Sequence, residues 1–202
     1  YTVINSTGGF TGSLSGWSVA WPGRGAPPTL ATNGNLLQFT AVPVTGGGIV
    51  HWRGDAGSVW NVNGISNWYN TGGPAVDKYF DGDHVTFGNT YGGTPVTNFS
   101  VSISANVAPA SVTVDSTSDY TISGAGAIAG TGTFTKRGSS TLVMQKTNTF
   151  TGQATIEAGT VNVGTFNGAL GNGQLPLSGG TVFGTNNGFN NSAIVVNAGN
   201  ST

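Results

Sequence analysis

The sequence of 202 residues predicts an all-β fold, a parallel β-solenoid with an aromatic-rich cap before it. Three observations predict this class. Short runs rich in Thr, Val, Ile and Phe alternate with turns of Gly, Asn and Ser, most clearly over residues 130–164. Apolar residues of similar context recur with a period near 20 residues. No segment carries the apolar period of an amphipathic helix, so we predict no helix longer than one turn.

The stretch 130–164 predicts four short strands. Each run is too short for a helix and is bounded by residues that favour tight turns. The predicted strands are Thr133-Phe134-Thr135, Thr141-Leu142-Val143-Met144, Ala154-Thr155-Ile156 and Thr160-Val161-Asn162-Val163. We interpret them as the sides of successive solenoid coils.

Two apolar series support this interpretation. The first contains residues 20, 19 and 21 positions apart: Ile122, Leu142, Val161 and Val182. The second contains residues 22 positions apart: Val112, Phe134 and Ile156. One coil per period would stack the members of each series into ladders inside a narrow core.

The N-terminal region is less periodic. Thr2-Val3-Ile4 and Leu36-Leu37-Gln38-Phe39-Thr40 read as strands, and Trp17-Ser18-Val19-Ala20-Trp21 would place two tryptophans on one face. We predict two regions, an irregular cap over 1–95 and solenoid repeats over 96–202. We expect the coils to continue or stack beyond the last residue.

Residues 49–91 contain three of the five tryptophans, Trp52, Trp60 and Trp68. Bulky rings can plug the open end of a solenoid core, and this is the interpretation we favour. The alternative is a carbohydrate-binding surface, because exposed aromatic rings pack against the apolar faces of sugars.

The central stretch resembles a known family. Gly132-Thr133-Phe134-Thr135-Lys136-Arg137-Gly138, then Asn148-Thr149-Phe150-Thr151-Gly152, then Ile156 to Gly164, is similar to the passenger-associated β-strand repeat of bacterial autotransporters. It departs from that pattern at Ser140, where Gly is usual, and by conservative changes at Phe134 and Phe150. The resemblance implies a right-handed parallel β-helix on a secreted or cell-surface protein, and it implies no catalytic residues.

Composition excludes several classes of partner. The formal net charge is −1 and only 6% of residues are charged, so a basic surface for nucleic acid is absent. No apolar run is long enough to span a membrane as a helix. The chain has no cysteine, which excludes thiolate chemistry and disulfides.

Asp77, Asp81 and Asp83 lie close together in sequence, beside His84. Carboxylate oxygens suit calcium, so these residues are a candidate calcium site. We favour turn-forming roles, because Asp side chains accept hydrogen bonds from nearby backbone amides and no known calcium-loop spacing is present. We therefore expect no cofactor.

An enzyme is not supported. Lys136, Arg137 and Lys146 show no partner acids at a solenoid spacing, and the expected role of Lys136 is to solvate a corner. Arg53-Gly54-Asp55 spells an integrin-recognition tripeptide, but we interpret it as a turn.

The sequence thus predicts a non-catalytic extracellular structural or adhesive protein of a bacterial surface or matrix. Its expected partners are other copies, through end-to-end or edge-strand assembly into filaments, or surface glycans. Thr2, Val3 and Ile4 are the candidate self-assembly strand. The alternatives are a carbohydrate-binding module that uses Trp52, Trp60 and Trp68, or a polysaccharide-active β-helix enzyme.

Overall fold

Short β-strands joined by glycine-rich turns make up the structure, a computed structural model. It describes residues 2–5, 24, 29–33, 35–40, 47–184 and 193–196. The chain divides into two units, Tyr1–Thr45 and Gly46–Thr202. The predicted run from Trp17 to Trp21 lies outside the described residues.

The first unit is a small antiparallel sheet. Its strands are β1 (Thr2–Asn5), β2 (Thr29–Asn33) and β3 (Leu36–Thr40), in the order β1-β3-β2. The structure confirms the predicted strand over residues 36–40, and it places β1 at an edge of this sheet.

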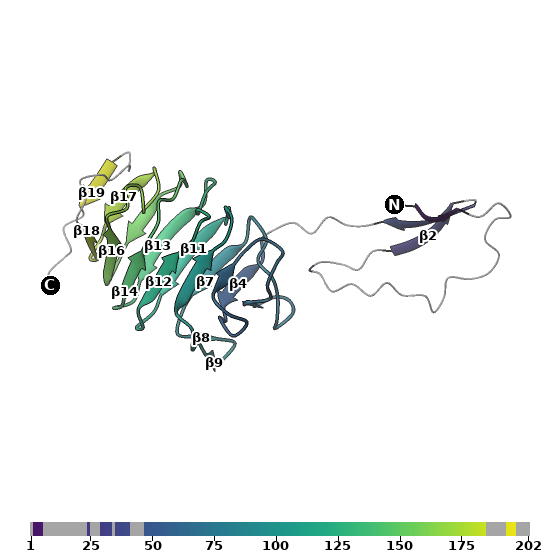
Figure 1. Cartoon of the computed structure of the whole chain (residues 1–202), viewed down its shortest axis with the longest axis horizontal. Coiled ribbons are helices and arrows are strands. Elements are labelled where there is room, and N and C mark those ends of the chain that lie inside the picture. Colours follow the sequence, from purple (N-terminus) through teal and green to yellow (C-terminus); the bar gives the residue numbers. More distant parts are fainter. Residues whose placement is uncertain are drawn as a thin grey trace. The chain divides into compact units, whose positions relative to one another are not determined.

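The second unit is a parallel β-solenoid (Figure 1). From β10 onward, successive strands alternate strictly between a six-stranded and an eight-stranded sheet. The six-stranded sheet contains β5 (Val59–Trp60), β10 (Ser100–Ile103), β12 (Tyr120–Ser123), β14 (Thr141–Met144), β16 (Thr160–Gly164) and β18 (Thr181–Gly184). The eight-stranded sheet contains β4 (Ile49–Trp52), β6 (Trp68–Asn70), β7 (His84–Phe87), β11 (Ser111–Asp115), β13 (Thr133–Arg137), β15 (Ala154–Ile156), β17 (Gln174–Leu177) and β19 (Ala193–Val196). A two-residue hairpin pair, β8 (Thr90–Tyr91) and β9 (Thr94–Pro95), projects from the coils. The pairings in the described part of this unit are parallel, with three exceptions. Strand β6 runs antiparallel to β4, β8 runs antiparallel to β9, and Trp68 forms an antiparallel bridge with Asp77.

Inward-facing apolar residues stack into ladders, as the sequence predicts. Leu142 pairs with Val161, and Val161 pairs with Val182. In the other sheet Val112 pairs with Phe134. Leu142, Val161, Val112 and Phe134 are buried, because alternate residues of each strand point into the space between the two sheets.

Two members of the predicted ladders, Ile122 and Ile156, each pair with a residue two positions away from the expected partner. Leu142 pairs with Tyr120 rather than Ile122, and Ile122 pairs with Met144. Ile156 pairs with Lys136 rather than Phe134. The corners differ in length between coils, so a period near 20 cannot fix the register. A shift by two residues keeps the same face of the strand, which is why both residues are still buried.

The parallel ladder begins earlier than the predicted boundary between residues 95 and 96. Strand β4 pairs in parallel with β7, and β7 pairs with β11. The region that we predicted to be an irregular cap therefore supplies strands to the same sheets. The sequence did not predict this continuity because the spacing there differs from the period near 20 residues. Val85 and Val112 pair although they are 27 residues apart, and the β8–β9 hairpin lies between them.

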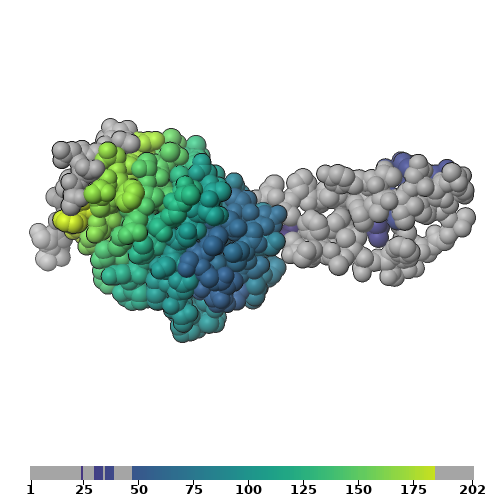
Figure 2. Space-filling view, viewed as in Figure 1, coloured from purple at the N-terminus to yellow at the C-terminus, as the bar shows by residue number. Residues whose placement is uncertain are grey.

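A single buried core runs through the stacked coils from Val50 to Leu175. The space-filling view shows successive coils in contact along this unit (Figure 2). The described residues include no helix, and therefore none that is long and apolar enough to cross a bilayer.

Candidate functional site

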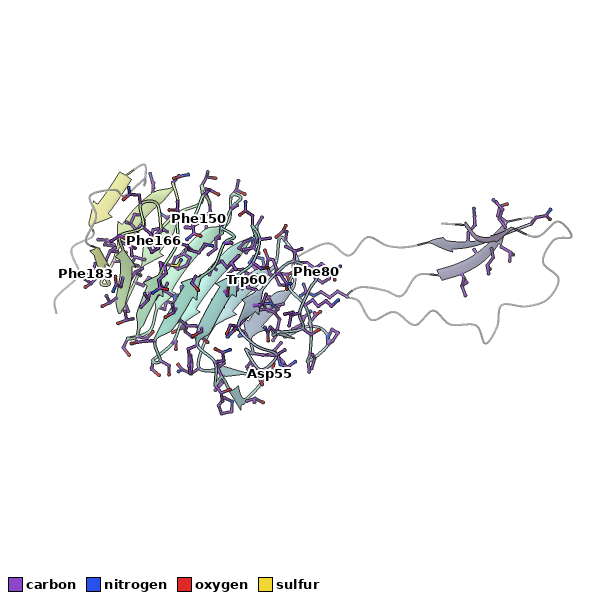
Figure 3. All side chains as sticks on the ribbon, viewed as in Figure 1. Asp55, Trp60, Phe80, Phe150, Phe166 and Phe183 are labelled. Atoms are coloured by element: carbon purple, nitrogen blue, oxygen red, sulfur yellow. The ribbon has the colours of Figure 1, made fainter. Side chains whose placement is uncertain are left out.

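An aromatic plug fills the first coils. It consists of Trp52, Trp60, Trp68, Tyr79 and Phe87, all with 0% exposure. The rings of Trp60 and Trp68 lie 5.5 Å apart between centroids, and those of Trp60 and Tyr79 lie 5.3 Å apart, both edge to face. Figure 3 labels Trp60 within the coils.

The burial of the plug argues against the predicted glycan-binding site. Trp52, Trp60 and Trp68 were the candidate glycan contacts, but no face of these rings reaches the surface. Strand β6 explains the burial: it reverses direction, pairs antiparallel with β4 through Trp52 and Trp68, and brings their rings together. The favoured interpretation, a hydrophobic plug, is the one that the burial supports.

The three predicted calcium ligands have hydrogen-bonding roles in turns. Asp83 is buried and accepts hydrogen bonds from the backbone N–H groups of Gly47, Gly48 and Phe80 at 2.8–3.1 Å. Asp81 accepts from the Tyr79 hydroxyl and from the Ala108 amide.

Asp77 accepts hydrogen bonds from the side chain of Asn70 and from the Lys78 amide. Within residues 47–184 and the other described segments, no three His, Cys, Asp or Glu side chains come together as a metal site would require. Calcium binding by Asp77, Asp81 and Asp83 stays the less favoured prediction, because these carboxylates accept hydrogen bonds from backbone amides and from the side chains of Asn70 and Tyr79.

The Arg53-Gly54-Asp55 tripeptide is folded against the coils. Arg53 forms an ion pair with Asp55. Gly54 is buried, and a Cβ atom there would lie 2.7 Å from Trp52 Nε1 and 2.9 Å from the Asn98 carbonyl oxygen. This packing leaves the tripeptide at a turn, as predicted, rather than at the tip of a projecting loop.

Lys136 does not have the solvent-exposed corner role that the sequence predicted. Its side chain is fully buried rather than spread on a solvated corner. It stands in the inward ladder between Val114 and Ile156, and its Nζ donates hydrogen bonds to the carbonyl oxygens of Arg137, Gly138 and Ala158. Burial lowers the pKa of this ammonium. Lys136 therefore joins the corner of one coil to the corner of the next.

The predicted absence of partner acids is also wrong. Arg137 Nε donates to Glu157 Oε2 at 2.7 Å, across 20 residues or one coil. The hydrogen bond and charge of Glu157 raise the pKa of Arg137. The pair lies on the outer surface, where strands β13 and β15 bring the two residues into neighbouring positions.

Sequence reasoning missed the buried lysines, although a signal was present. In β13 the burial alternates, so residue 136 must face the same side as buried Phe134. Lys146 is also buried at 4% exposure, and its Nζ has no hydrogen-bond partner among the described residues. Burial lowers its pKa too. A charged side chain is normally expected at the surface, so both lysines were expected to be exposed. The alternation of inward and outward residues along β13 places Lys136 inside.

Two comparisons with known proteins give matches. Residues 134–163 match the family described as passenger-associated-transport-repeat. Over 87 residues the chain is 36% identical to the Adhesin BmaC autotransporter of Brucella suis biovar 1 (strain 1330). That alignment covers 43% of this chain and 2% of the adhesin, so the chain corresponds to a very small part of its relative's length. No solved structure matches the chain.

The matched residues run from Phe134 to Val163, from the third position of the predicted repeat to its last strand. They contain Lys136, the Arg137–Glu157 pair and the stacked residues Leu142 and Val161. Residues 134–163 therefore match a passenger-associated-transport-repeat and lie within a parallel β-solenoid.

Proposed function

We propose that this chain is part of a non-catalytic, extracellular adhesive protein of a bacterial surface, in which the solenoid acts as a stiff scaffold. The observation that carries the proposal is the repeat at residues 134–163 together with the similarity to an autotransporter adhesin. The architecture supports a scaffold role, because stacked coils present long side faces and the core is filled by side chains.

Adhesion can be tested with the full chain. Beads coated with the folded chain should attach to cultured epithelial cells more than beads coated with the same chain after heat denaturation. Equal attachment of both bead types would contradict an adhesive role. A catalytic role would be indicated instead by release of soluble sugars from polysaccharides incubated with the chain.

We also propose that copies of this chain associate with one another through the edges of their strands. Strand β18 pairs with β16, and among the described residues no strand pairs with its other edge. Phe183 on β18 is 57% exposed and is labelled at this end of the coils in Figure 3. Open edges accept further strands, and the low net charge opposes association only weakly. Strand β1, with Thr2, Val3 and Ile4, is the proposed donor from a second copy.

Sedimentation velocity over a wide concentration range tests this association. The full chain should form larger species as its concentration rises, and Phe183→Lys should oppose them by placing charge on the β18 edge. Phe166→Lys is the control, because Phe166 is also exposed but lies outside β18. A monomer at every concentration would rule the association out.

A further inference from the structure

A second group of rings lies on the outer side of the first coils, apart from the buried plug. We call it the hairpin surface: His51, Arg53, Tyr69 and Tyr91. The rings of His51 and Tyr69 lie 6.3 Å apart and those of Tyr69 and Tyr91 lie 6.2 Å apart. The Arg53 guanidinium lies 5.4 Å from the centroid of the Tyr91 ring. All four residues are half-buried.

This surface differs in chemistry from the rest of the same sheet. Starting from His51, the outward positions of successive paired strands are Thr86, Thr113, Thr135 and Thr155. Threonine is an ordinary outward residue of a strand and needs no ligand to explain it. Aromatic rings and a guanidinium replace that pattern where the β8–β9 hairpin meets the coils.

The hairpin surface is held in place by its backbone. Gly92 packs so closely on Tyr69 that a Cβ atom would lie 2.7 Å from the ring. The Arg53 amide donates to the Asn67 carbonyl oxygen, and Trp52 Nε1 donates to the Asn98 carbonyl oxygen. A backbone fixed in this way loses little conformational entropy when the side chains on it bind a ligand.

Arg53 is incompletely satisfied in this arrangement. Its Nη2 bonds to Asp55, but Nε and Nη1 are buried and have no acceptor among the described residues. Buried N–H groups without acceptors are costly, and more so on a charged group. An incoming carboxylate could draw the guanidinium outward and accept from it in the paired geometry that arginine favours.

We propose that the hairpin surface binds an acidic sugar residue, with the sugar carboxylate on Arg53 and the pyranose ring against Tyr69 and Tyr91. Aromatic rings supply an apolar face for the sugar, and the guanidinium supplies the charge complement. Asp55, 38% exposed at its side chain, would release Arg53 and turn to solvent; Figure 3 labels it near the hairpin. The proposal names a ligand class for the proposed adhesive protein and rests on that function.

Calorimetry with the full chain and a galacturonic acid pentasaccharide tests the proposal, with a neutral galactose pentasaccharide and a pentaglutamate peptide as comparison probes. The acidic sugar should bind, and each comparison probe should bind at least about tenfold more weakly. Equal affinity for the neutral sugar, or for the peptide, would overturn the assignment. So would the absence of saturable binding.

Variants separate the ligand contact from folding. Arg53→Ala should weaken binding about tenfold or more, whereas Arg137→Ala, which removes another outward arginine paired with an acid, should leave it unchanged. Asp55→Asn should strengthen binding up to about fivefold, because Arg53 no longer has a competing carboxylate. Weaker binding by Asp55→Asn would contradict the proposal. Bead attachment without sugar binding would reject this inference alone, while sugar binding without attachment would reject the adhesive function alone.

Discussion

The ammonium of Lys136 lies directly beneath Gly159 of the next coil, so that a Cβ atom at residue 159 would come within 2.7 Å of Lys136 Nζ. Gly159 also has a φ of +69°, a conformation that side chains disfavour. The Lys136 side chain therefore occupies space that a side chain at residue 159 would need, beside the carbonyl oxygens of Gly138 and Ser140.

Gly159→Ala should lower the free energy of unfolding by about 2 kcal/mol or more, through backbone strain and overlap with the Gly138 and Ser140 carbonyl oxygens. Urea unfolding measures this change. Gly164→Ala is the matched control, since Gly164 also has positive φ, +53°, but a Cβ atom there meets nothing within 4 Å. An equal loss in both variants would show that strain alone accounts for Gly159.

The two buried lysines should respond in opposite directions to methionine. Lys136→Met removes the donor to three carbonyl oxygens and should destabilise the fold by about 1–3 kcal/mol. Lys146→Met removes a buried ammonium that has no hydrogen-bond partner among the described residues, and should stabilise it by about 1 kcal/mol. Urea unfolding of both variants checks the signs, and the same sign for both would contradict this account.

Stability should rise as the pH approaches the ordinary pKa of lysine and should fall at higher pH. Burial holds the pKa of Lys136 and Lys146 below the ordinary 10.5. Between the lowered and ordinary values the unfolded chain binds more protons than the folded chain, so the free energy of unfolding increases with pH. Burial raises the pKa of Tyr79 and Tyr120 above the ordinary 10.0. Above that value the unfolded tyrosines lose protons that the folded ones keep, so the free energy of unfolding decreases.

Unfolding in urea at intervals from pH 7 to 11 should therefore show a rise in stability followed by a fall. The double variant Lys136→Met, Lys146→Met should lack the rise and retain the fall. A steady decline from pH 7 in the unsubstituted chain would be inconsistent with two buried lysines.

Replacing Trp60 tests the plug. Trp60→Ala should cost about 3–5 kcal/mol of unfolding free energy, because the ring is fully buried among Trp68, Tyr79 and Phe87. Trp60→Phe should cost less, since it keeps a ring and removes an indole N–H that has no partner among the described residues. Unfolding curves measure both, and an unchanged midpoint for Trp60→Ala would mean that the ring contributes nothing to the core.

Asp83→Asn should destabilise the solenoid by about 1–3 kcal/mol, since the carboxylate accepts three backbone hydrogen bonds that an amide cannot fully replace. Thermal unfolding measures the loss. Addition of calcium, or of a chelator, should leave the midpoint of the unsubstituted chain unchanged. A rise of the midpoint with calcium would restore the metal-site alternative for Asp77, Asp81 and Asp83.

The fold class and the stacking of the strands could be predicted from the residues. Alternation within β14 and β16, and a spacing near one coil, were enough to place Leu142 over Val161, because every coil must bury the same face. The resemblance of residues 134–163 to a known repeat could also be recognised from the residues alone.

The exposure of individual side chains could not be predicted in the same way, because it depends on contacts between coils. Whether Trp52, Trp60 and Trp68 form a plug or a surface depends on the reversal of β6, a long-range pairing that local pattern does not encode. The register of Ile122 and Ile156 depends on corner lengths, and the buried ammonium of Lys136 has two carbonyl acceptors from its own coil and one, that of Ala158, from the next. Burial and hydrogen bonding are properties of neighbouring coils, so they became visible only when the coils were stacked.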